Sequence, residues 1–154
     1  MAVARQFRLE RVLKLREQKE KELQGHLARA YQRQLEQETL LDRMNDNKHT
    51  QIEMITQELS SQHVEMTYVQ FGTAYLERLQ NLIDRQGNVV KQAVKATDQR
   101  RVEVHQAMKA RKAIEKLREH WWSALVEEDR QRDIKTVDEI STVQFNQRRS
   151  QDRV

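Results

Sequence analysis

The sequence predicts an all-α fold in which two long helices form an antiparallel coiled-coil hairpin. Three observations predict this fold. The 154 residues include no proline and only three glycines, so few positions interrupt a helix once it starts. Charged residues make up 34% and aromatic residues 5%, which is typical of long helices and coiled coils. Apolar residues also recur at gaps of three and four along most of the chain, which is the spacing of one helix face.

The first helix is expected over about residues 5–59. Two polar residues, Arg16 and Glu20, fall where this stripe calls for apolar ones. Polar positions in the seam weaken a coiled coil but help to fix its register. The apolar stripe of this helix comprises Phe7, Leu9, Val12, Leu13, Leu23, Leu27, Ala30, Tyr31, Leu35, Leu40, Leu41, Met44, Ile52, Ile55 and Leu59.

A turn is expected over about residues 60–66, because the apolar stripe stops at Ser60. Thr67 and Gln70 then have the spacing of a capping box. In that motif the threonine hydroxyl and the glutamine side chain satisfy amides at a helix start. The second helix is therefore expected to begin at about Thr67.

The second helix is expected over about residues 67–149, and Thr97, Arg101 and Arg111 interrupt its stripe. Each helix has a narrow apolar stripe and a broad charged face, so each needs a partner. Two such helices joined by a short turn should fold back on each other as one domain over residues 1–154. The second stripe comprises Leu76, Leu79, Ile83, Val90, Val94, Val104, Met108, Ile114, Leu117, Trp121, Leu125, Ile134, Val137 and Ile140.

The two predicted helices have unequal lengths, roughly 55 and 80 residues, or about 80 Å and about 120 Å. With a turn centred near residue 63, paired residue numbers should add up to about 127. Leu13 then faces the neighbourhood of Ile114, and Leu27 that of Arg100. Residues beyond about Trp122 should have no partner in the first helix.

The charges of the second helix divide into two segments. Residues 91–118 hold nine lysines and arginines against three acidic residues, whereas residues 119–139 hold seven acidic residues against three basic ones. Complementary patches of charge set orientation and association rate. The pattern therefore indicates oriented docking onto partner proteins.

Several classes of active site lack their motifs. There is no glycine pattern of a phosphate-binding loop, and the five histidines lack a metal-ligand spacing. The acidic run Glu127–Asp129 is expected on a solvated helix face, without the water-excluding pocket that enzymes usually have. We therefore expect a non-enzymatic protein with no cofactor and no metal.

The cysteine content and the lengths of the apolar segments indicate the cellular compartment of the protein. The absence of cysteine excludes disulfides and cysteine-bound zinc. No stretch approaches the ~20 apolar residues that cross a bilayer, and the N-terminus has no apolar core of a signal peptide. We therefore expect a soluble protein kept in the cytoplasm.

Two binding alternatives stay open. A sequence pI of about 9.5 and a basic stretch over residues 100–118 are compatible with nucleic-acid binding, but acidic residues interleave nearly everywhere. The basic first turn around Arg8 and Phe7 is compatible with a membrane surface. The coiled-coil seam is the favoured interpretation of that turn.

Three stretches go beyond a generic coiled coil. They are FRLERVLKLRE at residues 7–17, YVQF at residues 68–71 with LER at 76–78, and IEKLRE at residues 114–119 followed by DEIS at 138–141 and Phe145. In this order and spacing they resemble the FliJ family of flagellar export proteins over nearly the whole chain. The stalk protein of a virulence type III secretion system is the nearest alternative, and a purely structural coiled coil is a further one.

The resemblance implies a non-catalytic component of the flagellar type III export apparatus. Its fold would resemble the central stalk subunit of rotary ATPases, with the paired termini entering a hexameric ATPase ring. The other implied partners are the membrane-embedded export gate and the export chaperones that it escorts, without nucleic acid and without direct membrane insertion. The implied location is the cytoplasm, peripherally at the export apparatus of the inner membrane.

The resemblance also implies two sets of site residues. The gate contact falls on Phe71, Tyr75, Leu76 and Leu79, with Gln37 and Leu41 from the first helix. Met44 and Lys48 depart from the family pattern there, and packing beside the turn is an alternative role for Phe71. The ring contact falls on Arg5, Arg8, Arg11, Arg118, Trp122, Asp138 and Glu139. Trp121 and Trp122 lie about 100° apart on a helix, so Trp121 fits the seam and Trp122 the partner.

Overall fold

The structure is a computed structural model that describes the backbone of residues 6–151 and the side chains of residues 6–148. It confirms the all-α fold. Helix α1 spans Glu10–Leu59 and helix α2 spans Met66–Gln151, with no strand in the described range. The Glu10 amide donates to the Phe7 carbonyl at 3.1 Å. Its carboxylate lies in the first turn of α1, where a negative charge interacts favourably with the helix dipole and stabilises the helix start.

The loop of residues 60–65 joins the helices without glycine or proline. The Ser60 hydroxyl donates to the Thr56 carbonyl at 2.8 Å and so closes the end of α1. The amide of Glu65 donates to the Glu58 carboxylate at 3.0 Å, which ties the far side of the loop to α1. No described residue has a positive φ, so the turn needs no residue with special backbone freedom.

The predicted cap of the second helix is wrong. The Val69 amide donates to the Glu65 carbonyl at 3.2 Å, so Glu65 is the N-cap and α2 begins at Met66. Thr67 lies inside the first turn and not at the cap position. The physical reason is the bond between Glu58 and the Glu65 amide, which fixes the helix start before Thr67.

Contacts between residues divide the chain into two compact units. Unit 1 is the part up to Glu17 together with the part from Lys109 onward, and unit 2 is Gln18–Met108. Each unit contains a segment of both helices and is described by itself below. The expectation of a single domain stays a prediction.

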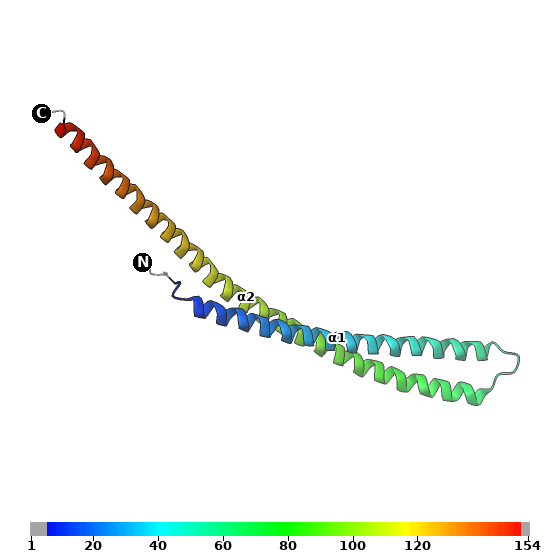
Figure 1. The fold of residues 1–154 in the computed structure, drawn as a ribbon. Coiled ribbons are helices and arrows are strands. Elements are labelled where there is room, and N and C mark those ends of the chain that lie inside the picture. Colours follow the sequence, from blue (N-terminus) through cyan, green and yellow to red (C-terminus); the bar gives the residue numbers. More distant parts are fainter. Residues whose placement is uncertain (1–5, 152–154) are drawn as a thin grey trace. The chain divides into compact units, whose positions relative to one another are not determined.

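In unit 2 the two helices run antiparallel side by side and meet at the loop (Figure 1). The buried apolar side chains of this unit are Ile55, Leu79, Ile83 and Val104. Cross-helix bonds give the register: the Lys48 ammonium donates to the Gln80 amide oxygen at 2.6 Å, and the Gln86 amide group donates to the Gln37 side-chain oxygen at 2.9 Å. The residue numbers of the first pair add up to 128 and those of the second to 123, so both pairs lie within about one helical turn of the predicted register.

Two polar residues of unit 2 lie in the seam. Thr97 is 1% exposed, and its hydroxyl donates to the Ala93 carbonyl at 3.0 Å, so burial leaves no unsatisfied donor. Glu20 is also buried and accepts a bond from Gln24 at 3.2 Å. Arg101 is different, because its exposed side chain pairs with Asp98 on the surface of α2.

In unit 1 the start of α1 packs on α2 around Leu13, which is 1% exposed. From Trp122 to Arg148 every side chain is exposed except Leu125, which is half-buried. This exposure is what the expected overhang of α2 beyond about Trp122 requires, and the overhang itself stays a prediction. We call residues 126–148 the C-terminal arm, and its large exposed apolar side chains are Val126, Ile134, Val137, Ile140, Val143 and Phe145. Neither α1 nor α2, as far as they are described, has a segment long and apolar enough to span a membrane.

Candidate partner-binding surfaces

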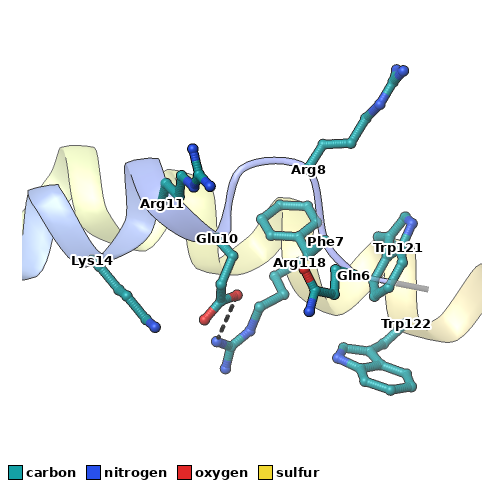
Figure 2. A pocket seen from close by; sticks show the side chains of 9 residues that line it. All are labelled: Gln6, Phe7, Arg8, Glu10, Arg11, Lys14, Arg118, Trp121 and Trp122. Carbon is teal, nitrogen blue, oxygen red and sulfur yellow. Dashed lines mark ion pairs between the residues drawn. The ribbon is translucent and has the colours of Figure 1, made fainter. Parts of the chain in front are cut away.

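A cavity of about 720 Å³ lies in unit 1, where the residues at the start of α1 meet α2. We call it the terminal pocket. It combines three aromatic rings with four cationic side chains and a single carboxylate. Figure 2 shows its lining residues, which are Gln6, Phe7, Arg8, Glu10, Arg11, Lys14, Arg118, Trp121 and Trp122.

The aromatic rings of the terminal pocket form a continuous chain. The Phe7 and Trp121 ring centroids lie 5.7 Å apart with an interplanar angle of 50°. The Trp121 and Trp122 centroids lie 5.3 Å apart at 68°, an edge-to-face arrangement that aromatic pairs favour. Trp121 is half-buried, whereas Trp122 is 56% exposed. The structure thus confirms the prediction that Trp121 faces the seam and Trp122 faces outward.

The charges of the terminal pocket leave it positive. The Glu10 carboxylate lies 3.6 Å from the Arg118 guanidinium, and both side chains are more than 40% exposed. In Figure 2 the side chains of Lys14, Arg118 and Trp122 extend to one side of the pocket, whereas Arg8 extends to the opposite side. One carboxylate against four cations makes this region attractive to anions.

The structure gathers only part of the predicted ring contact. Arg8, Arg11, Arg118 and Trp122 all line the terminal pocket. Asp138 and Glu139 do not line it: they are exposed on the C-terminal arm, about 24 Å along α2 from Trp122 at 1.5 Å per residue. Arg5 lies outside the described residues.

Sequence reasoning missed several lining residues of the terminal pocket. The predicted ring contact includes none of Phe7, Trp121, Gln6, Glu10 and Lys14. The predicted register held a signal for one of them, since it places Glu10 opposite the neighbourhood of Leu117 and Arg118.

A second surface surrounds the loop in unit 2. We call it the turn patch, and its exposed apolar and aromatic side chains are Leu59, Val64, Met66, Tyr68, Phe71 and Tyr75. Phe71 is 73% exposed, so the alternative that it packs within the hairpin is wrong. The Tyr75 hydroxyl accepts a bond from the Asn47 amide group at 2.9 Å, which orients its ring beside α1.

The other predicted gate residues lie nearer the seam. Leu79 is 5% exposed and belongs to the core, while Leu76, Leu41 and Gln37 are half-buried. Gln37 accepts from Gln86 across the hairpin. Four turn-patch residues, Leu59, Val64, Met66 and Tyr68, were not predicted as site residues; their sequence signal was apolar bulk flanking a turn.

A smaller cavity of about 250 Å³ in unit 2 also carries positive charge. Three alanines, Ala30, Ala93 and Ala96, contribute to its lining. We call it the basic groove, and its polar lining residues are His26, Arg29, Arg33 and Arg100. Arg100 is paired with Glu103 at 2.8 Å, and Arg29 lies 3.1 Å from a ring nitrogen of His26.

The acidic run after the terminal pocket shows surface pairing. Glu127 lies 3.9 Å from Arg130, and Glu128 pairs with Arg132 one turn further along α2. These side chains are more than half exposed, so they do not form an enclosed acid–base site. No cluster of three or more metal-ligating side chains occurs within the described part of the chain.

A family model described as the flagellar FliJ protein matches residues 5–150. The chain belongs to the FliJ family. The FliJ family belongs to flagellar protein export, so this chain is a flagellar export-related protein and the resemblance of its motifs is confirmed. No curated protein and no solved structure was found to match it.

Proposed function

We propose that this FliJ-family chain couples the export ATPase ring to the membrane export gate, with no catalytic activity of its own. The observation that carries the proposal is the presence of one exposed aromatic surface in each unit of a family member, at Trp122 and at Phe71. Exposed clusters of large apolar side chains mark interaction sites on soluble proteins. Two such clusters favour a protein that binds two partners.

The terminal pocket is the proposed contact with the ATPase ring. Trp122 is exposed beside the Arg118 guanidinium, and tryptophan and arginine are the residues most enriched among energetically important interface positions. Arg8 and Arg11 extend the same region along α1. The more distant Arg5, Asp138 and Glu139 are proposed as secondary contacts.

The turn patch is the proposed contact with the export gate. Phe71 and Tyr75 supply the exposed rings, and Leu76, Leu41 and Gln37 border them from the hairpin. Leu79 would contribute indirectly: its side chain is buried, so it stabilises the packing of the helix that carries Phe71 and does not touch the partner.

The C-terminal arm is the proposed contact for export chaperones. Its apolar side chains Val126, Val137 and Ile140 are 63%, 60% and 53% exposed, with no helix of unit 1 covering them. An amphipathic partner helix could bury such a stripe. Escort of chaperones therefore fits an arm that is left unpaired within its own unit.

Turnover of the purified cognate export ATPase tests the proposal. Adding the chain should raise the turnover rate, and the two proteins should co-elute. Trp122→Ala should reduce the stimulation, while Val102→Ala, an exposed apolar residue of unit 2, should leave it unchanged. Absence of both stimulation and co-elution would contradict the proposal. A salt-sensitive shift of duplex DNA without any ATPase effect would favour the nucleic-acid alternative instead.

A further inference from the structure

We propose that the terminal pocket receives an acidic partner segment in which a carboxylate stands close to a large apolar side chain. In the free protein Glu10 occupies the position of that carboxylate. The inference deepens the proposed function and rests on it for the source of the segment, which is a segment of the ATPase ring. It differs from that proposal in naming the chemistry that the pocket selects and the residue that competes for it.

The charge of the pocket favours an acidic segment. Lys14 and Arg118 extend to the same side of the pocket, and only the Glu10 carboxylate faces them among the lining residues (Figure 2). The contact of Glu10 with Arg118, at 3.6 Å, shows that a carboxylate fits beside this guanidinium. Glu10 is the single carboxylate among the pocket residues, so its charge does not balance both Lys14 and Arg118 and the pocket favours a second negative charge.

The aromatic chain of the pocket favours an apolar anchor beside the acid. Trp122 extends to the same side as Lys14 and Arg118, and 56% of it is exposed. Trp121 supports it edge-to-face, and Phe7 supports Trp121 in turn. A tryptophan that packs on a neighbouring ring is partly preorganised, so a partner side chain can bury it with less loss of conformational freedom.

Glu10 is suited to be displaced. Its pair with Arg118 is exposed on both sides and longer than a direct charged hydrogen bond, so it contributes little to the stability of the fold. A partner carboxylate can exchange with it at small cost. Because Glu10 competes with the partner for Arg118, its neutralisation should strengthen partner binding.

The chain offers a direct readout of this exchange. Its only two tryptophans are Trp121 and Trp122, and both line the terminal pocket. Tryptophan fluorescence of the full chain therefore reports on this pocket alone. The probe is a synthetic peptide with acidic residues flanking a leucine and without tryptophan or tyrosine, compared with the same peptide carrying serine in place of the acids.

The acidic peptide should give a saturable change in fluorescence, and the serine peptide should not. Arg118→Gln and Lys14→Gln should each weaken peptide binding about threefold to fivefold, in line with exposed ion pairs. Trp122→Ala removes one of the two fluorescent reporters, so its peptide binding is measured by calorimetry, and its affinity for the peptide should fall about tenfold or more. Glu10→Gln should tighten binding by about threefold. Arg33→Gln, which removes one charge from the basic groove of unit 2, should leave binding unchanged.

Several outcomes would overturn the inference. Equal binding of the acidic and serine peptides would do so, as would weaker or unchanged binding by Glu10→Gln. A single-stranded oligonucleotide that binds more tightly than the peptide would assign the pocket to nucleic acid. Concentration-dependent dimerisation, competed by a peptide of residues 124–129, would assign it to a second copy of this chain, since that segment joins Leu125 and Val126 to three acids.

The inference and the proposed function can fail separately. If wild-type chain stimulates the ATPase and Arg118→Gln does so at the same concentrations, the inference is overturned and the function stands. If the acidic peptide binds as expected while wild-type chain neither stimulates nor co-elutes with the ring, the function is contradicted and so is the ring as the source of the segment.

Discussion

The rings of Phe7 and Trp121 lie 5.7 Å apart, centroid to centroid, and join the residues just before α1 to α2. Both rings line the terminal pocket, and Leu13, six residues after Phe7, is the buried side chain of the adjoining seam. The pocket therefore depends on coiled-coil packing for its shape. Among its charged residues, Glu10 of α1 and Arg118 of α2 lie 3.6 Å apart across the two helices.

Leu13 is the test of this packing. It is 1% exposed, so Leu13→Ala should lower the free energy of unfolding by about 2–4 kcal/mol through lost burial and a cavity. Leu15, which is 64% exposed on the same helix, is the matched control. Leu15→Ala should change the free energy of unfolding by less than about 0.5 kcal/mol. Urea unfolding followed by circular dichroism measures both. Equal effects of the two substitutions would show that the seam does not run through Leu13.

Gly72 should respond to alanine differently from Gly87. A Cβ at Gly72 would lie 2.8 Å from Ile55 Cδ1, a buried side chain, whereas a Cβ at Gly87 meets no atom within 4 Å. Gly87→Ala should stabilise the protein by about 0.5–1 kcal/mol through helix propensity. Gly72→Ala gains the same propensity but crowds Ile55, so it should be about 1–3 kcal/mol less stable than Gly87→Ala. Thermal unfolding of the two variants measures the difference, and equal melting temperatures would contradict the close approach at Gly72.

Phe71 should matter for binding and not for folding. Because it is 73% exposed, Phe71→Ala should leave the free energy of unfolding within about 0.5 kcal/mol of wild type. Affinity for the cytoplasmic part of the export gate should fall by about tenfold or more, measured by calorimetry. Leu79→Ala is the contrasting variant, since it empties a core position and should cost about 2–5 kcal/mol. Unchanged gate affinity in Phe71→Ala would remove the turn patch as the gate contact.

The C-terminal arm should be the first part of the chain that a protease cleaves. A helix must open locally before cleavage, and the side chains of the C-terminal arm are exposed throughout residues 126–148. Trypsin should therefore cut first at Arg130, Arg132 or Lys135, which mass spectrometry of the early fragments identifies. Early cleavage at Arg111, which is partly buried, would contradict this order of stability.

The register of the hairpin could be predicted because the apolar stripes give the faces that meet and the end of the first stripe gives the centre of the turn. The pairing of Lys48 with Gln80 follows from that register. The start of α2 was expected within one residue of Met66, but its capping residue could not be predicted in the same way. It depends on the Glu58 carboxylate reaching the Glu65 amide across the loop, and a threonine two residues later imitates a cap in the sequence.

The exposure of Phe71 also could not be predicted from the spacing of apolar residues. Gly72 occupies the seam position that faces Ile55. Because glycine has no apolar side chain, the hydrophobic pattern of the sequence does not reveal this seam position. The adjacent residue is rotated by about 100° and so faces outward. For the terminal pocket, the register placed Glu10 near Arg118, but the shared side of Lys14, Arg118 and Trp122 depends on side-chain directions that only the structure gives.

The central claim is that the two surfaces bind different partners. The chain contains no cysteine, so single-cysteine variants give site-specific cross-linking without background. Ser123→Cys lies next to Trp122 and Gln70→Cys next to Phe71, and both positions are exposed. In a mixture of the export ATPase and the export gate, Ser123→Cys should cross-link to the ATPase and Gln70→Cys to the gate. Cross-linking of both variants to the same partner, or of each to the opposite one, would contradict the account.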